Sequence, residues 1–222
     1  GVQTCALPIL DMYKCGKCNL RGCSNGNMDK LMKICPTREI ELQQKAKQLY
    51  EEEENRKIAY NAGLVEAEGY CQYTRLKEII EFAKKCGYKK IGIAFCIGLK
   101  REMQTVQKIF EHHGFEVFSV ICKNGAMPKS TIGLEASQTI SKCSDEVMCN
   151  PIGQALFLNE AKVDLNVILG LCVGHDTLAM KYMEAPITTL VVKDRVTGHN
   201  PVAAIYNAES YFEKKLFDKD EE

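Results

Sequence analysis

The sequence predicts an α/β fold, in which a mainly parallel, Rossmann-like sheet with helices on both faces follows a cysteine-rich segment and a helical segment. From Tyr88 on, short apolar runs alternate with segments of helical period, the pattern of parallel strands joined by right-handed crossovers. Three of these runs end in a cysteine. The length of 222 residues suits one such domain with an appendage, and it is enough to bury a sizeable core.

The first nine residues, GVQTCALPI, have no charge and neither a helical nor an alternating period. They do not read as a signal peptide, because no basic residue precedes the apolar stretch and Pro8 interrupts it. All nine resemble one translated frame of a common sequencing adapter, so we expect residues 1–9 to be a non-native artefact. Cys5 is then expected to belong to the artefact, and eleven of the twelve cysteines to the native sequence.

The charge balance excludes some classes of partner. The chain has 29 basic and 29 acidic residues, whereas proteins that bind nucleic acids or membrane surfaces usually carry a basic excess. No apolar run approaches the roughly 20 residues that span a bilayer. We therefore expect a cytoplasmic protein that binds neither nucleic acid nor membrane. In that reducing compartment, so many cysteines indicate metal binding or catalysis rather than disulfides.

Residues 10–36 form a cysteine- and glycine-rich segment without apolar period. Its cysteines follow the spacing Cys-x₂-Cys-x₄-Cys-x₁₁-Cys-Pro, and the x₂ pair lets two sulfurs of one turn face the same metal. Four thiolates would complete the coordination of zinc or of a four-iron cluster, and the spacing does not decide between them. The predicted metal ligands are Cys15, Cys18, Cys23 and Cys35.

Residues 37–87 are predicted to be helical. In the stretch TRLKEIIEFAKKCG, apolar residues recur at i, i+3, i+4 and i+7, Thr74 can cap the start, and Gly87 stands where a C′ glycine is expected. The acidic run 51–54 is interpreted as a solvated helix face.

Residues 88–214 are predicted to form the α/β domain, and 215–222 a charged tail. Strands are expected at 89–96, 115–122, 164–172 and 187–194. Helices are expected at 100–114, 150–162, 175–184 and 200–212, two of which begin with an Asn-Pro start signal. Neither a G-x-G-x-x-G after the first strand nor a P-loop motif is present, so a nucleotide-binding function is the weakest interpretation.

Cysteines converge at one edge of this predicted sheet. The carboxyl ends of parallel strands share an edge, and ligand sites of open α/β sheets lie there. Because helices start at that same edge, a cysteine just before a helix joins the set. Ligands delivered singly from separate segments favour an iron–sulfur cluster over a zinc knuckle. Packing as small hydrophobes is the alternative. The predicted cofactor ligands are Cys96, Cys122, Cys149 and Cys172.

The same edge carries polar residues that can handle protons or charge. The segment LCVGHD follows the third strand, and KDR followed by His199 comes after the fourth. Helix caps and solvated charges are the alternative roles for such residues. Beside a metal edge, they are candidates for a catalytic role. The predicted catalytic residues are His175, Asp176, Lys193 and His199.

Several blocks resemble the family called domain of unknown function 1847, described as uncharacterised metal-binding proteins of anaerobic bacteria and archaea. The blocks are GYKKIGIAFCIGL, CKNGAMPKSTIGL, MCNPIGQALFLNEAKVDLNVILGLCVGHDTL and APITTLVVKDRVTGHNPVAAIY. The resemblance extends from about Tyr13 and implies metal binding and a cytoplasmic location, without an established reaction. It also implies that both cysteine groups belong to the family pattern, whereas the first nine residues depart from it.

Two functions follow as hypotheses. The first is an iron–sulfur protein, with a [4Fe–4S] cluster at the sheet edge, that performs a redox or sulfur-handling step on a small molecule or exchanges electrons with a partner. The second is a non-catalytic, zinc-binding carrier, sensor or adaptor. The sequence does not give the substrate, the metal or the oligomeric state.

Overall fold

The computed structural model describes residues 13–217, so the predicted artefact at residues 1–9 lies outside the described part. The chain divides into two compact units, residues 1–62 and 63–222. The helices are α1 (Ile40–Leu49), α2 (Glu53–Gly69), α3 (Arg75–Lys85), α4 (Lys100–His112), α5 (Pro151–Glu160), α6 (His175–Tyr182), α7 (Pro201–Tyr206) and α8 (Glu213–Phe217). The strands are β1 (Lys90–Phe95), β2 (Glu116–Ile121), β3 (Leu165–Leu169) and β4 (Ile187–Val191).

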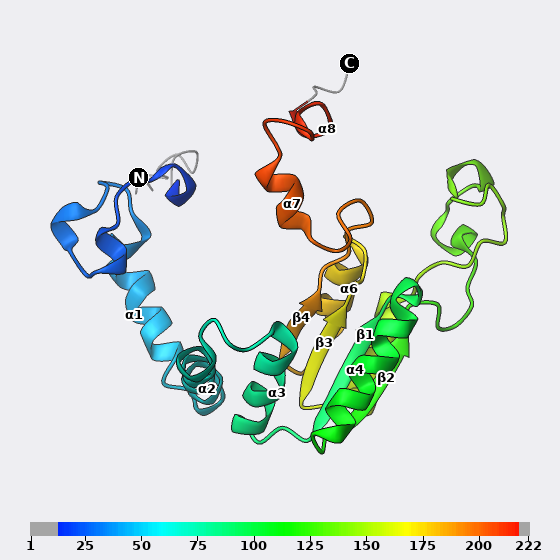
Figure 1. The fold of residues 1–222 in the computed structure, drawn as a ribbon, viewed down its shortest axis with the longest axis horizontal. Helices are drawn as coiled ribbons and strands as arrows, with labels where there is room; N and C mark the ends of the chain where they lie inside the picture. The colour runs from blue at the N-terminus through cyan, green and yellow to red at the C-terminus, as the bar shows by residue number, and fades with distance from the viewer. Residues whose placement is uncertain (1–12, 218–222) are drawn as a thin grey trace, which may run out of the picture. The chain divides into compact units, whose positions relative to one another are not determined.

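The four strands form one parallel sheet in the order β2-β1-β3-β4, which confirms the predicted α/β class (Figure 1). The central strands are apolar because both of their faces are covered, and all five residues of β3 are buried. The pairing continues past two strand ends: the Cys96 N–H donates to Leu169 O (3.2 Å) and the Cys122 N–H to Phe95 O (2.9 Å). The carboxyl ends of β1, β2 and β3 therefore lie side by side.

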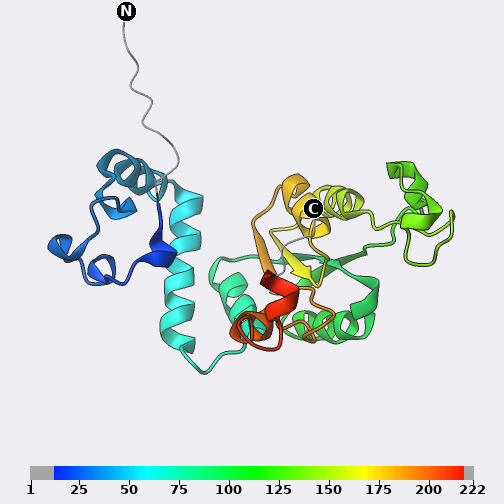
Figure 2. The same ribbon diagram turned by 90° about the horizontal axis from the view of Figure 1, so that it is seen from above.

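Helices cover both faces of the sheet, as predicted (Figure 2). One face packs against α3 and α4, with Ile80 and Phe110 buried against Ile93 and Val167. Neighbouring strand residues point the other way, because side chains alternate along a strand. The second face packs against α5 and α6, and its cluster of buried residues includes Cys96 and Cys122. Both sulfur-bearing strand ends thus lie on the α5/α6 side.

From residue 13 on, the cysteine-rich segment and its end are built of single 3₁₀ turns at Cys15–Lys17, Gly22–Ser24, Met28–Lys30 and Pro36–Arg38. The Arg38 guanidinium holds part of the segment together, because it donates to the carbonyl oxygens of Met28 (2.8 Å) and Met32 (3.1 Å). Gly22 packs against backbone oxygens of the third turn, where a Cβ would lie 2.4 Å from Lys30 O.

Some predicted elements differ in extent. The third strand ends at Leu169 rather than at Cys172, because Gly170 turns the chain with φ +66°. The last Asn-Pro helix is short, ending at Tyr206 instead of near 212, and the Asn200 side chain makes no capping hydrogen bond. The predicted cap of α3 is present, since the Thr74 side chain accepts from the Lys77 N–H.

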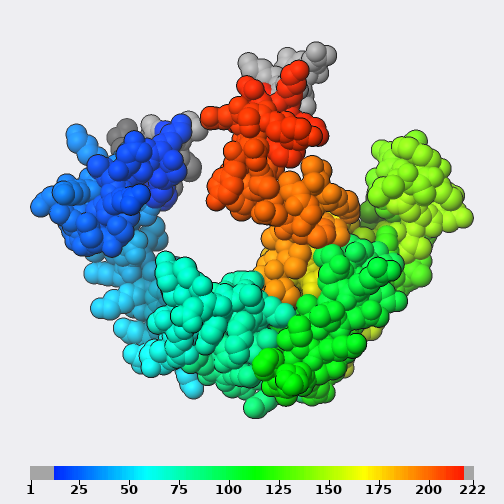
Figure 3. Space-filling view, viewed as in Figure 1, coloured from blue at the N-terminus to red at the C-terminus, as the bar shows by residue number. Residues whose placement is uncertain are grey.

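The segment between β2 and α5 forms a lobe, defined here as residues 125–148 (Figure 3). A single antiparallel bridge between Pro128 and Val147 closes its base. Above the base, Lys129 Nζ pairs with Glu146 Oε1 at 2.5 Å. Within residues 13–217, no helix has both the length and the apolar composition needed to cross a membrane.

Candidate thiol site at the carboxyl edge of the sheet

The strand order places the switch point of the sheet between β1 and β3, and the space outside the carboxyl ends of these two strands is called the crevice below. The chain leaves β1 through α4 on one face of the sheet and leaves β3 through α6 on the other. At such a switch point the two loops diverge, and open α/β sheets bind their ligands there. Cys96 directly follows β1, and Cys172 lies three residues after β3. Two predicted ligands therefore flank this crevice.

Three of the four predicted cysteines gather in one place: Cys96 and Cys122 belong to the buried cluster under α5 and α6, and Cys149 packs against that cluster. The Cys122 thiol can donate to Cys96 or to Cys149, but only to one at a time, because it has a single proton. The Cys122 Sγ also accepts from the Ile97 N–H at 3.3 Å. Cys96 and Cys122 are buried and Cys149 is half-buried. The sequence separations are large, so only the parallel topology brings these residues together.

Cys149 is held in place by the start of α5. The next residue, Asn150, donates its backbone N–H to Cys122 O (2.7 Å), and its side-chain oxygen caps the helix by accepting from the Gly153 N–H (2.9 Å). A second bond joins Asn150 Nδ2 to the side-chain oxygen of Asn124 (3.0 Å). The predicted Asn-Pro start signal thus also sets the position of a site sulfur.

His175 is the first residue of α6, and its side chain hydrogen-bonds to Cys149. That bond raises the pKa of His175 against the opposing effect of burial. The bond to Cys122, followed by the bond to His175, lowers the pKa of Cys149 below its ordinary range. Conversely, the bonds to Cys149 and then to Cys96 raise the pKa of Cys122. The shifts therefore favour the neutral thiol at Cys122 and the thiolate at Cys149, and they favour the charged form of His175.

Two cations from the loop after β4 reach the sulfurs. Arg195 Nη2 donates to Cys172 Sγ at 3.0 Å. Lys193 contacts Cys96, and both lie against Gly98, where a Cβ would be 3.4 Å from Lys193 Nζ and 3.8 Å from Cys96 Sγ. The bond to Cys122 and, after it, the Gly98 backbone and the charge of Lys193 lower the pKa of Cys96.

The remaining predicted catalytic residues have mainly local contacts. Asp176 accepts a hydrogen bond from the Thr177 N–H at 2.7 Å, as an acidic residue in the first turn of a helix commonly does. His199 closes the loop 194–199: its Nδ1 accepts from the Asp194 N–H (3.1 Å), and its own N–H donates to Asp194 O (2.8 Å). These bonds and the positive φ of 68° hold the His199 ring against its own loop, and its catalytic role stays a prediction.

The N-terminal cysteines are arranged differently. Cys35 is buried, Cys18 is half-buried, and the other two are exposed. Cys18 Sγ donates to Leu20 O at 3.6 Å. Over residues 13–217, no three His, Cys, Asp or Glu side chains are placed so that they could hold one metal ion, at either cysteine group. Metal binding by Cys15, Cys18, Cys23 and Cys35 stays a prediction.

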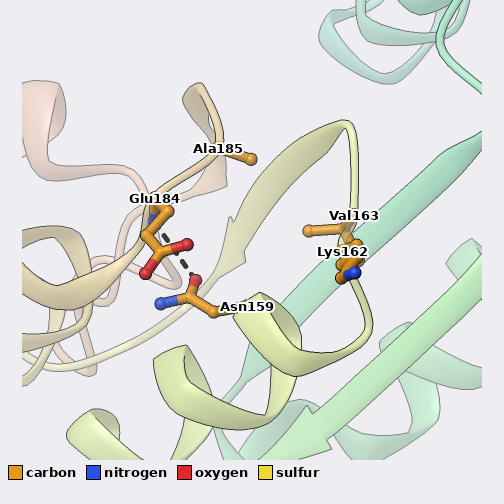
Figure 4. A pocket seen from close by; sticks show the side chains of 5 residues that line it. All are labelled: Asn159, Lys162, Val163, Glu184 and Ala185. Atoms are coloured by element: carbon orange, nitrogen blue, oxygen red, sulfur yellow. Dashed lines mark hydrogen bonds between the residues drawn. The ribbon is translucent and has the colours of Figure 1, made fainter.

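A pocket lies at the opposite, amino-terminal edge of the sheet (Figure 4). It is lined by Asn159 of α5, Lys162 and Val163 before β3, and Glu184 and Ala185 before β4. The Asn159 side chain joins α5 to the end of α6 by accepting from the Glu184 N–H (3.1 Å) and donating to Tyr182 O (2.8 Å). These bonds hold α5 and the end of α6 together. None of the predicted site residues lines the pocket.

Two cations of the site were not among the predicted site residues. Arg195 stands two residues after Lys193, so its place behind the last strand was the signal that could have identified it. Lys123 follows the strand-end Cys122 directly, and its charge acts on Cys149 and His175. Strand-end position identifies cysteines and lysines equally well, but the direction of long basic side chains depends on tertiary contacts.

Comparisons with known proteins agree with the resemblance. An uncharacterized protein of Methanocaldococcus jannaschii is 48% identical over 205 residues, which cover 92% of this chain and 98% of the relative. No solved structure matches the chain. The model of the family described as "Protein of unknown function (DUF1847)" matches residues 35–190. This range includes Cys35 and the four cysteines at the carboxyl edge of the sheet, Cys96, Cys122, Cys149 and Cys172. The chain belongs to the DUF1847 family.

Proposed function

We propose that this protein binds an iron–sulfur cluster at the carboxyl edge of its sheet and uses it in a redox or sulfur-handling step on a small molecule. The observation that carries the proposal is the gathering of Cys96, Cys122 and Cys149, delivered by three separate segments, in or against one buried cluster. Packing alone does not require three thiols to meet at the edge where α/β proteins bind ligands.

The donor set fits such a cluster chemically. Thiolates are soft ligands that select iron–sulfur clusters, zinc or Cu(I). Cluster-bound thiolates carry negative charge, and Lys193 and Arg195 lie beside the sulfurs to offset it. Backbone N–H groups that point at the sulfurs, such as that of Ile97, also suit a cluster, because hydrogen bonds to sulfur tune its potential.

Cys172 differs from the other three predicted cluster ligands in its contacts. Cys172 hydrogen-bonds to Arg195, whereas the other three cysteines lie in or against one buried cluster. We therefore assign the ligand role to Cys96, Cys122 and Cys149. A four-iron cluster held by three cysteines would supply one iron with an open position for a substrate. His175, whose side chain lies against Cys149, would be placed to exchange a proton near the cluster.

A second function, a non-catalytic zinc module, has support in the N-terminal unit. The spacing of Cys15, Cys18 and Cys23 suits a closed structural site. Arg38 fixes the backbone next to Cys35 by binding carbonyl groups on the preceding turns. In the whole protein this segment would carry a structural or electron-transferring metal. A cytoplasmic location fits both functions, because thiols stay reduced there.

The test is purification without oxygen, followed by analysis of iron, zinc and acid-labile sulfide and a visible spectrum. We expect about four irons and four sulfides per cluster, with broad absorbance near ~400 nm. Cys122→Ser and Cys149→Ser should each lose this absorbance. The matched control is Cys143→Ser, since Cys143 is exposed in the lobe and should keep it.

Metal analysis can also contradict the cluster proposal. Zinc at about one per chain, with neither iron nor sulfide, would support the zinc module and contradict the cluster proposal. Far-UV circular dichroism of each variant separates loss of the cluster from loss of the fold. If both folded edge variants retain the full chromophore, these cysteines are not its ligands.

A further inference from the structure

We propose that the crevice between β1 and β3 binds a small oxyanion, held by Lys193 and Arg195. This inference names the substrate class of the site, and it rests on the proposed function for the chemistry that follows binding but not for binding itself. The oxyanion is a carboxylate, a phosphate or a sulfur oxyanion, which share the geometry that a guanidinium recognises.

Lys193 and Arg195 both lie at the switch point of the sheet. Lys193 reaches the sulfur that follows β1, and Arg195 reaches the sulfur that follows β3. These two strands flank the switch point of the sheet, so the cations lie on both sides of the crevice. A single short loop after β4 supplies both of them, and no other cations in the described residues are paired with strand-end sulfurs in this way.

The nearby carboxylates leave the positive charges of Lys193 and Arg195 available to an anion. Asp194, between the two cations, turns its carboxylate onto its own loop, where it accepts from the N–H groups of Val196 (2.8 Å) and Thr197 (3.0 Å). Within residues 13–217, neither Lys193 nor Arg195 forms an ion pair with a carboxylate. The other charged groups at this edge are Lys123, His175 and Asp176, which act on Cys149 or on each other. No carboxylate among the described residues therefore neutralises Lys193 or Arg195 directly.

Arg195 has hydrogen-bonding capacity to spare. A guanidinium has five N–H donors in a planar fork, and the described residues engage Nη2 with Cys172. The side chain is exposed, so the rest of the fork can receive a ligand from solvent. A fork anchored by one sulfur and open on another side is suited to bidentate binding of an oxyanion beside that sulfur.

Alkylation of Cys172 in the reduced, metal-free full-length protein tests the proposal. Iodoacetate is an anion, iodoacetamide is its neutral analogue, and the ratio of their rates reports local attraction of anions independently of the thiolate fraction. Peptide mass spectrometry gives the rate at each cysteine, with the exposed Cys143 and Cys71 as internal controls. We expect the ratio at Cys172 to exceed that at the controls by about tenfold, the lower end of electrostatic rate enhancement.

Variants identify the responsible groups. Arg195→Gln and Lys193→Gln should each lower the ratio at Cys172 several-fold, and Lys181→Gln, on the exposed end of α6, should not change it. Arg195→Lys keeps the charge but loses the fork, so its ratio should stay high while its affinity for oxyanions falls. Circular dichroism confirms that each variant is folded.

Protection completes the test. Millimolar phosphate, sulfate or acetate should slow the reaction of iodoacetamide with Cys172 in the unmodified protein but not in Arg195→Gln, and the order of the three anions identifies the preferred class. If the ratio at Cys172 equals that at Cys143, or if none of the anions protects, the cations only balance thiolate charge and the proposal is wrong. Because no metal is present, failure of the cluster proposal does not affect this result.

Discussion

Asn150 and Asn200 each precede a proline that begins a helix, but they differ in what their side chains do. The Asn150 side chain caps α5 through the Gly153 N–H and also bonds to Asn124. The Asn200 side chain makes no capping bond. Sequence alone predicts the same role for both, because the start signal is identical. In front of α5 the chain is held by Cys122 and Asn124, which bond to Asn150 itself, whereas in front of α7 the bonds of His199 to Asp194 do not involve Asn200.

We predict that Asn150→Ala lowers the free energy of unfolding by about 1–2 kcal/mol, the usual effect of losing a helix cap. Asn200→Ala, the matched control, should change it by less than about 0.5 kcal/mol, as surface substitutions generally do. Urea denaturation followed by circular dichroism measures both. If both variants lose the same free energy of unfolding, the bonds of the Asn150 side chain to Gly153 and Asn124 do not stabilise the start of α5.

Within the thiol site, sequence position predicted the cysteines better than the polar residues. A cysteine at the end of a parallel strand has its place fixed by the backbone, and Cys96 and Cys122 follow their strands directly. The direction of His199 depends instead on a positive φ inside a six-residue loop, which no periodicity reveals. The partner of Cys172 was also not predictable, because Arg195 reaches it through a flexible side chain.

At the scale of elements, the strands and the long amphipathic helices were predictable because their apolar periods match their burial. Ile79, Ile80 and Ala83 of α3 are all buried, as their spacing indicates. Segments held by side-chain bonds were not predictable. The lobe at residues 125–148 is an example, since it has a single β-bridge and its order comes from polar contacts.

The lobe depends on Glu146. Its carboxylate pairs with Lys129 and accepts from both the N–H and the hydroxyl of Ser141 (2.6 Å each). The bond to Lys129, followed by those to Ser141, lowers the pKa of Glu146 to about 2 from an ordinary value of 4.5. Because the pKa is lower in the folded lobe, the stabilisation is complete above about pH 4.5 and is lost as the pH falls towards 2.

We therefore predict that the amide resonance of Ser141 titrates with a midpoint near pH 2, well below that of an unpaired glutamate. Nuclear magnetic resonance of the labelled protein measures it. In Glu146→Gln the titration of Ser141 should disappear, and hydrogen exchange in the lobe should become faster at neutral pH. A midpoint near 4.5 would mean that Lys129 and Ser141 do not hold this carboxylate.

At the scale of the whole molecule, the two cysteine groups belong to different units, residues 1–62 and 63–222. The N-terminal group lies on a segment of 3₁₀ turns with few buried side chains, whereas the edge group is part of a cluster that includes Ala155 and Leu158 of α5. A small segment with little core commonly depends on a metal for its order, while a packed α/β unit does not.

This contrast predicts that the two groups bind metal independently and with different consequences. Cys15→Ser together with Cys18→Ser should remove the metal of the N-terminal segment and make residues 13–36 sensitive to protease, while the edge chromophore stays unchanged. Cys122→Ser should do the reverse: it should lose the chromophore while the N-terminal metal and its protection persist. Metal analysis, visible spectra and limited proteolysis of the same samples measure all three quantities. Simultaneous loss of both metals in either variant would show that the two units share one site, and the assignment of separate roles to the two cysteine groups would then be wrong.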